Sequence, residues 1–250
     1  AGAAMLDVNA HGSTPTSLSM YDVTQFPYAL QATRDPISGR TEGLVDNDRA
    51  RSFAPKTFFT NTPVEYWGGG RNAALVHTSP DGKKDLVLGQ DTRVYFLTGA
   101  QHGPARFPTT RGLGQQPDNP LEYIWTMRAL MDAMEKWLRN GTAPPPSRYP
   151  TLADRTLVAA DTVAFPPVPG VQSPREVEPH RINGTVVPFL VPQVDADGNE
   201  VAGVRTPESL VPLATYTGWN FRNASTGGTS LLVSLLGARV PFPQIGRAHV

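Results

Sequence analysis

Glu65 and His102 are the residues whose types and positions could support acid–base chemistry. Each follows a run rich in β-branched and aromatic residues, at 56–60 and at 93–98 respectively. A histidine can take a proton from a hydroxyl nucleophile while a carboxylate holds its other ring nitrogen and stabilises the imidazolium. An acid after one strand and a histidine after the next is the order that ends a Ser–acid–His triad. A glutamate or a histidine after a strand is more often an ordinary loop residue. The two together are therefore a candidate acid–base pair, with the ordinary loop reading as the alternative.

The sequence contains no serine in the frame of a nucleophile elbow, because no G-x-S-x-G pattern occurs. Ser13, Ser17 and Ser19 lie in a polar leading segment without the flanking glycines. The absence of cysteine excludes disulfides, thiolate metal sites and a cysteine nucleophile. No pair of histidines has the spacing of metal ligands, and we therefore predict neither a metal nor another cofactor.

Two strands and a connecting helix are predicted to position the acid and the histidine. The runs 56–60 and 93–98 favour buried strands, and 66–77 is helix-like between them. The carboxyl ends of parallel strands meet at one edge of a sheet. We therefore expect Glu65 and His102 to lie close together despite their separation in sequence.

The clearest helix is predicted over residues 120–139. Asn119 is the expected N-cap and Pro120 takes the first helical position. Glu122 stands where a capping-box carboxylate is found. Gly141 supplies the expected stop. The expected apolar face consists of Leu121, Ile124, Trp125, Met131, Met134, Trp137 and Leu138.

We predict two regions, with a boundary in the proline run at 144–146. Residues 1–143 form the first region, in which 1–40 is polar and turn-rich like loops or a lid and 42–52 can form a short helix. Residues 144–244 form a proline-rich, β-containing extension that packs on the first region.

The run 195–199 is predicted to be the turn of a hairpin between 188–194 and 200–205. Its acidic spacing is similar to that of a calcium loop. The glycine is displaced, however, and Thr206 stands where a bidentate carboxylate is needed, which favours the turn.

Several ordered motifs resemble a large bacterial group of α/β-hydrolase domain-containing proteins. They occupy residues 61–67, 74–82, 94–103, 144–150, 191–200 and 212–220. The resemblance implies an α/β fold: the C-terminal part of an α/β-hydrolase sheet with crossover helices, followed by the extension. It implies that His102 is the triad histidine and Glu65 the acid, although the glycine run 68–70 departs from the family pattern. Tyr66 and Trp67, next to the acid, are predicted to line the substrate pocket.

The resulting expectation is a fragment of a serine esterase whose substrate is a small-molecule carboxylic ester. The nucleophile and the oxyanion hole would lie upstream, so the chain alone is expected to be inactive. The alternative is a non-catalytic binding or scaffold module. A serine elbow upstream of residue 1 would favour the enzyme, and its absence from the full gene would favour binding.

Charge and hydropathy exclude two classes of partner from our prediction. The formal net charge of the 250 residues is zero, which gives no electrostatic case for nucleic acid or an anionic membrane surface. No apolar run approaches the length of a membrane span.

The last residues are expected to be an artefact of metagenomic sequencing. Residues 244–250 can be encoded by CAG ATC GGA AGA GCA CAC GTC, which from its second base matches the start of a common sequencing adapter. We therefore expect residues 245–250 to be translated adapter and assign no function to His249.

Overall fold

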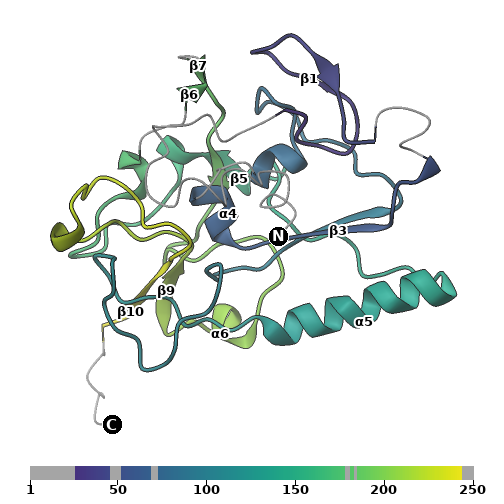
Figure 1. The fold of residues 1–250 in the computed structure, drawn as a ribbon. Helices are drawn as coiled ribbons and strands as arrows, with labels where there is room; N and C mark the ends of the chain where they lie inside the picture. The colour runs from purple at the N-terminus through teal and green to yellow at the C-terminus, as the bar shows by residue number, and fades with distance from the viewer. Residues whose placement is uncertain (1–25, 46–51, 69–72, 178–180, 183–184, 244–250) are drawn as a thin grey trace.

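A computed structural model describes residues 26–45, 52–68, 73–177, 181–182 and 185–243, which together form a mixed α/β arrangement (Figure 1). The leading segment 1–25, most of the segment expected to form the helix at 42–52, and the expected adapter at 245–250 lie outside these ranges.

A parallel strand pair, β3 (Thr57–Asn61) and β4 (Thr92–Phe96), runs from the middle of the molecule towards its right side in Figure 1. In its register Phe59 lies opposite Val94. The two strands predicted from the β-branched and aromatic runs are confirmed, with boundaries shifted by a residue or two.

The described part of the connection between these strands contains two short helical elements. They are the short helix α4 (Pro63–Trp67) and the 3-10 turn η1 (Ala73–Val76), with 69–72 outside the described residues. The helix predicted over 66–77 is therefore confirmed only at its two ends.

The second edge of β4 is completed by two segments from the C-terminal half of the chain. Arg148 bridges to Tyr95 and Val204 bridges to Leu97, both in the parallel direction. The Phe96 N–H donates to the Arg148 carbonyl at 2.8 Å, and the Val204 N–H donates to the Phe96 carbonyl at 2.7 Å. Residues distant in sequence thereby satisfy the backbone of β4.

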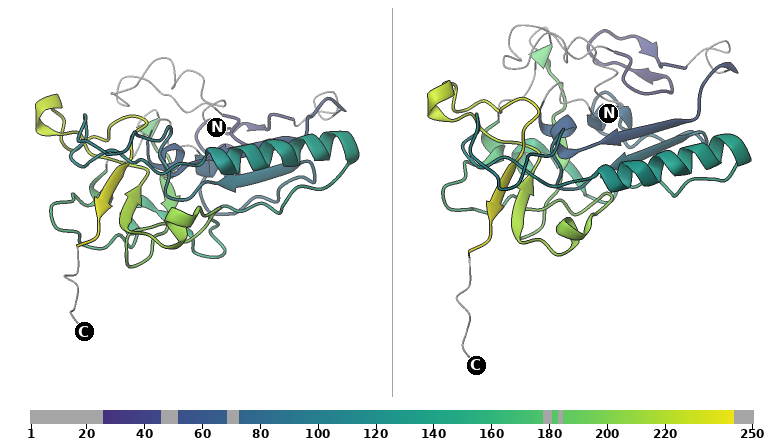
Figure 2. Two further views of the ribbon diagram at one scale, coloured as in Figure 1. Left: turned by 90° about the horizontal axis from the view of Figure 1, so that it is seen from below. Right: turned by 60° about the horizontal axis from the view of Figure 1, so that its bottom comes forward.

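Helix α5 (Ile124–Asn140) runs along the β3–β4 pair (Figures 1 and 2). Its Trp137 ring stacks on Phe58, with the ring centroids 5.7 Å apart. Gly141 ends the helix at φ 69°, which confirms the predicted stop.

The predicted start of this helix is wrong. It begins at Ile124 rather than at Pro120, and Tyr123 occupies the N-cap. Asn119 is fully buried and its amide hydrogen-bonds the Gly99 and Thr217 carbonyls, so it packs into tertiary structure and does not cap α5.

The prediction that these apolar side chains form the buried face of α5 is also wrong for most of them. Within the helix Leu130 and Trp137 are buried, whereas Trp125, Met131 and Leu138 are each more than 60% exposed. The described sheet beneath α5 is narrow, so it covers one stripe of the helix and leaves the remaining apolar side chains outside.

The N-terminal described segment contains a small antiparallel hairpin, β1 (Thr33–Arg34) and β2 (Thr41–Glu42). This corrects two expectations, because residues 33–34 are paired strand rather than loop and Glu42 belongs to β2 rather than to a helix.

The extension consists of short antiparallel pairs and single helical turns. The pairs are β5 (Leu157–Ala159) with β8 (Leu190–Pro192), β6 (Arg181–Ile182) with β7 (Thr185–Val186), and β9 (Ala214–Thr217) with β10 (Ala238–Pro241). The helical turns are η2 (Ala160–Thr162), η3 (Pro174–Glu176), α6 (Pro207–Leu210) and η4 (Ala224–Thr226).

The predicted hairpin turn at 195–199 is confirmed. The Gly198 N–H donates to the Asp195 carbonyl at 3.0 Å, and Val194 bridges antiparallel to Glu200. Gly198 adopts φ 76°, which explains the glycine at this position.

The extension shares its hydrophobic core with the central strands. One buried cluster joins Phe59 and Phe96 to Leu157 and Leu190, and another joins Ala100 and Leu121 to Ala214 and Tyr216. No helix in the described ranges has the length and apolarity that crossing a membrane requires.

Candidate active site

The carboxylate of Glu65 is held by the start of α4. Thr62 precedes this helix, Pro63 opens it, and Glu65 takes the third helical position. The backbone N–H and the hydroxyl of Thr62 both donate to Glu65 Oε2, at 2.6 and 2.7 Å. This capping-box arrangement fixes one carboxylate oxygen within a residue that is 8% exposed.

The other oxygen of Glu65 meets His102. The distance from Glu65 Oε1 to His102 Nδ1 is 2.9 Å, and the histidine side chain is 35% exposed while the acid side chain is 7% exposed. The two residues meet because α4 follows β3, the loop of His102 follows β4, and these strands are parallel. The structure thus brings together the two residues that the sequence singled out.

The electrostatics of the pair determine which nitrogen of the imidazole is basic. The hydrogen bond that His102 makes to the Glu65 carboxylate raises the pKa of His102 above its ordinary value, against the opposing effect of partial burial. An ionised carboxylate can only accept hydrogen bonds, so Nδ1 carries a proton. In the neutral ring Nε2 is then the nitrogen that can accept a proton from a hydroxyl group.

The loop of His102 begins with a glycine that the backbone requires. Gly99 adopts φ 73°, and a Cβ atom at this position would lie 3.1 Å from Leu121 Cδ1. Gly103 differs, because a Cβ there would meet no heavy atom within 4 Å and no positive φ requires glycine. Of the two glycines that flank this loop, Gly99 is therefore the one that the backbone requires.

Residues that sequence reasoning did not identify as part of the site also contact this pair or its loop. The Tyr123 hydroxyl donates to the His102 carbonyl, and buried side chains of Gln101, Asn119 and Glu200 contact the same loop. The Thr-x-x-Glu spacing from Thr62 to Glu65 is a capping-box signal that can be detected in the sequence. The other contacts depend on tertiary packing.

Tyr66 and Trp67 lie in the hydrophobic core. Both are at most 2% exposed. The Tyr66 hydroxyl lies 2.9 Å from His77 Nε2, and the Trp67 ring packs against Trp219 with centroids 6.0 Å apart. Their role in lining a substrate pocket stays a prediction, and in this structure their contacts are packing contacts.

His77 is a fully buried histidine whose Nε2 lies at hydrogen-bond distance from the Tyr66 hydroxyl. Burial lowers its pKa to about 4, so the ring is neutral near neutral pH. Within the described ranges no group of histidine, aspartate and glutamate side chains gathers as metal ligands. His11 and His180 lie outside these ranges.

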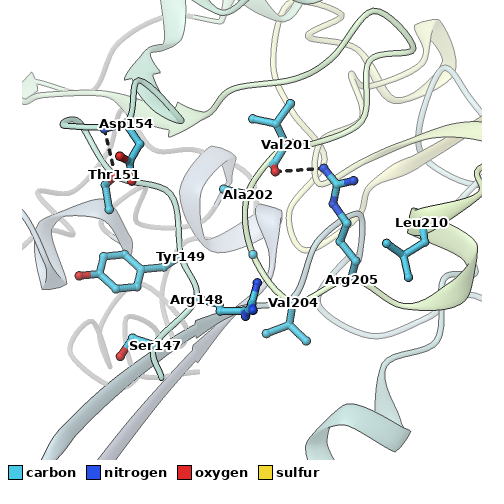
Figure 3. Close-up of a pocket in the computed structure, with 11 residues that line it drawn as sticks. Ser147, Arg148, Tyr149, Thr151, Asp154, Val201, Ala202, Val204, Arg205 and Leu210 are labelled. Atoms are coloured by element: carbon cyan, nitrogen blue, oxygen red, sulfur yellow. Dashed lines mark hydrogen bonds between the residues drawn. The ribbon is translucent and has the colours of Figure 1, made fainter. Parts of the chain in front are cut away.

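A cavity of about 780 Å³ lies elsewhere, between the segments 147–154 and 201–210 (Figure 3). Neither Glu65 nor His102 lines it. Its Arg205 side chain donates to the Val201 carbonyl at 3.0 Å and is thereby committed to its own loop. The candidate site is therefore the Glu65–His102 pair and not this cavity.

Comparison with protein families gives one match that covers most of the chain. The model of a family described as an alpha/beta hydrolase domain matches residues 27–247. Comparison with curated proteins and with solved structures gives no match.

Proposed function

The chain belongs to the alpha/beta hydrolase domain family, and from this premise we propose that it carries the base and the acid of a serine esterase. The observation that supports the proposal is the 2.9 Å contact between His102 Nδ1 and the buried Glu65 carboxylate. A parallel strand pair that presents an acid and then a histidine matches the order Ser–acid–His of this fold.

In the proposed reaction His102 is first a general base and then a general acid. His102 Nε2 takes the proton of a serine hydroxyl as its oxygen attacks the ester carbonyl carbon. The imidazolium returns this proton to the departing alcohol as the C–O bond breaks, which leaves an acyl-enzyme. A water molecule then repeats the sequence, which releases the carboxylic acid and restores the serine.

Glu65 acts through His102. Its ionised carboxylate holds the Nδ1 proton, which orients the ring, and it stabilises the positive charge that develops on the imidazole. Thr62 keeps the carboxylate in place, because both of its donors bind the oxygen that does not face His102.

The serine in this proposal belongs to a part of the parent protein outside these 250 residues, which contain no serine elbow. Removing the nucleophile of a triad costs about a million-fold in rate in a well-studied case. We therefore propose that the 250-residue chain alone does not hydrolyse esters.

The test compares p-nitrophenyl acetate and butyrate hydrolysis by the full-length protein, its His102→Ala variant and the 250-residue chain. His77→Gln is the matched control, because it replaces another histidine while leaving the pair intact. We expect activity in the full-length protein and the control, and a loss of at least about a thousand-fold in His102→Ala. Equal activity in His102→Ala and the parent would contradict the assignment, and inactivity of all of them towards both esters would favour a binding module.

A further inference from the structure

The loop that carries His102 is held by buried polar side chains from distant segments. We propose that Glu200 is a positioning residue for His102, acting with Asn119 and Gln101 to hold residues 99–103 where the histidine meets Glu65. The assignment deepens the proposed function and rests on it.

Glu200 holds the first residue of the loop. Its carboxyl oxygen Oε2 accepts a hydrogen bond from the Gly99 N–H at 2.8 Å, across a large separation in sequence. Glu200 is 3% exposed and stands directly after the hairpin turn at 195–199. Burial raises its pKa to about 8, so the carboxyl group is largely neutral at neutral pH.

A buried carboxyl group is costly, and packing alone does not explain one here. Leaving a polar group of this kind unpaired inside a protein is destabilising. The Arg205 guanidinium donates to the Glu200 carbonyl at 3.2 Å rather than to its carboxyl group. The Glu200 carboxyl group instead accepts a hydrogen bond from the loop at the Gly99 N–H, which is the contact that our proposal uses.

Asn119 binds the same residue, Gly99, through the backbone carbonyl of that glycine. Its Nδ2 donates to the Gly99 carbonyl at 2.7 Å and to the Thr217 carbonyl at 3.0 Å. Its Oδ1 accepts from the Leu121 N–H at 3.0 Å. The fully buried amide thereby links the loop that follows β4 to β9.

Gln101 holds the loop on the far side of His102. Its Nε2 donates to the Gly103 carbonyl at 2.6 Å. Its Oε1 accepts from the Gly237 N–H at 2.8 Å and from the Asn119 N–H at 3.2 Å. The backbone is therefore fixed before and after His102 by groups that are themselves buried.

Fixing the backbone of this loop with hydrogen bonds has a direct chemical consequence. The His102 side chain is one-third exposed, so solvent and packing around the ring alone do not define its position. A misplacement of about 1 Å can cost on the order of a hundred-fold in rate. A loop fixed by hydrogen bonds before substrate arrives keeps Nδ1 at 2.9 Å from Glu65.

The test uses the full-length protein with Glu200→Ala, which removes the acceptor, and Glu200→Gln, whose amide oxygen can still accept from Gly99. Asn199→Ala is the matched control. Asn199 is equally buried and on the same hairpin, but its side chain binds the Ala214 carbonyl and the Tyr216 N–H of β9. Glu200→Asp replaces Glu200→Ala if the alanine variant does not fold.

Two measurements separate positioning from general stability. The first is kcat per active site, counted by titration with a fluorophosphonate, together with KM. The second is the pKa of the His102 imidazole from an NMR titration, which needs no activity. We expect Glu200→Ala to lower kcat per site by about ten-fold or more with little change in KM, and to lower the His102 pKa towards its ordinary value. We expect Glu200→Gln to restore both and Asn199→Ala to change neither.

Unchanged kcat per site and unchanged His102 pKa in Glu200→Ala would overturn the proposal, as would equal losses in Asn199→Ala. If the parent protein neither hydrolyses esters nor reacts with the fluorophosphonate, the proposed function fails and the NMR titration decides alone. A fall in the His102 pKa confined to Glu200→Ala then supports the positioning role, whereas equal His102 pKa values in the parent and the variants refute it.

Discussion

Replacing Glu65 with glutamine tests the site with a minimal change in shape. The hydroxyl and the backbone N–H of Thr62 both donate to Glu65 Oε2. An amide nitrogen cannot accept from them, so the glutamine must place its oxygen towards Thr62 and its NH₂ group towards His102. His102 Nδ1 then has to accept, and the ring proton moves to Nε2.

The expected loss of activity is large because this tautomer cannot accept the proton of the serine. The corresponding change in a serine protease lowers kcat by about ten-thousand-fold, which corresponds to about 5 kcal/mol of transition-state stabilisation. We expect a similar loss in Glu65→Gln of the full-length protein at neutral pH, measured as kcat for p-nitrophenyl butyrate. NMR of the ring nitrogens should show the proton on Nε2 instead of Nδ1.

Glu122→Gln is the control for the loss of one carboxylate nearby. Glu122 is exposed and its Oε1 accepts from the Tyr123 and Ile124 N–H groups, so this change should alter kcat less than about two-fold. If Glu65→Gln kept kcat within ten-fold of the parent, or kept the proton on Nδ1, the assignment of Glu65 as the acid would be refuted.

Three further predictions follow from the same structure. Because Glu65 raises the pKa of His102, the acid limb of kcat/KM should have its midpoint above about 6.5, and a midpoint at or below that value would contradict the pairing. Gly99→Ala should lower the free energy of unfolding by about 1–3 kcal/mol, because the φ angle of Gly99 is 73°. Gly103→Ala should change the free energy of unfolding by less than about 0.5 kcal/mol. Urea denaturation measures both values, and equal effects would contradict the loop geometry. His77 has a lowered pKa in the folded state, so the unfolded chain binds more protons and stability should decline as pH falls from about 6.5 to about 4. The decline should weaken in His77→Gln, and an unchanged slope there would assign it to other groups.

Local patterns predicted the elements whose signals lie within a few residues. The β-branched and aromatic runs predicted β3 and β4, and Gly141 predicted the end of α5. The turn at 195–199 was also predictable, since an Asx-rich run with glycine closes on its own backbone. In each case the deciding hydrogen bonds or steric limits are local, so they can be read from the sequence.

The start of α5 could not be predicted in this way. Asn119 has the sequence signal of an N-cap, yet its amide binds the carbonyls of Gly99 and Thr217. A buried position that satisfies two carbonyls competes with capping, and this competition depends on segments distant in the chain. The exposure of Trp125 and Met131 has a similar origin, because the width of the sheet under the helix decides which stripe is covered.

The sequence by itself determined the candidate acid and base, the strands that precede them and the resemblance to a hydrolase family. Tertiary structure alone decided that Glu65 and His102 meet at 2.9 Å, since the parallel pairing of β3 and β4 brings α4 and the His102 loop to one edge of the pair. It also decided that Glu200 reaches the Gly99 N–H. Such contacts join residues far apart in the chain, and they form only when the packed core brings their segments together.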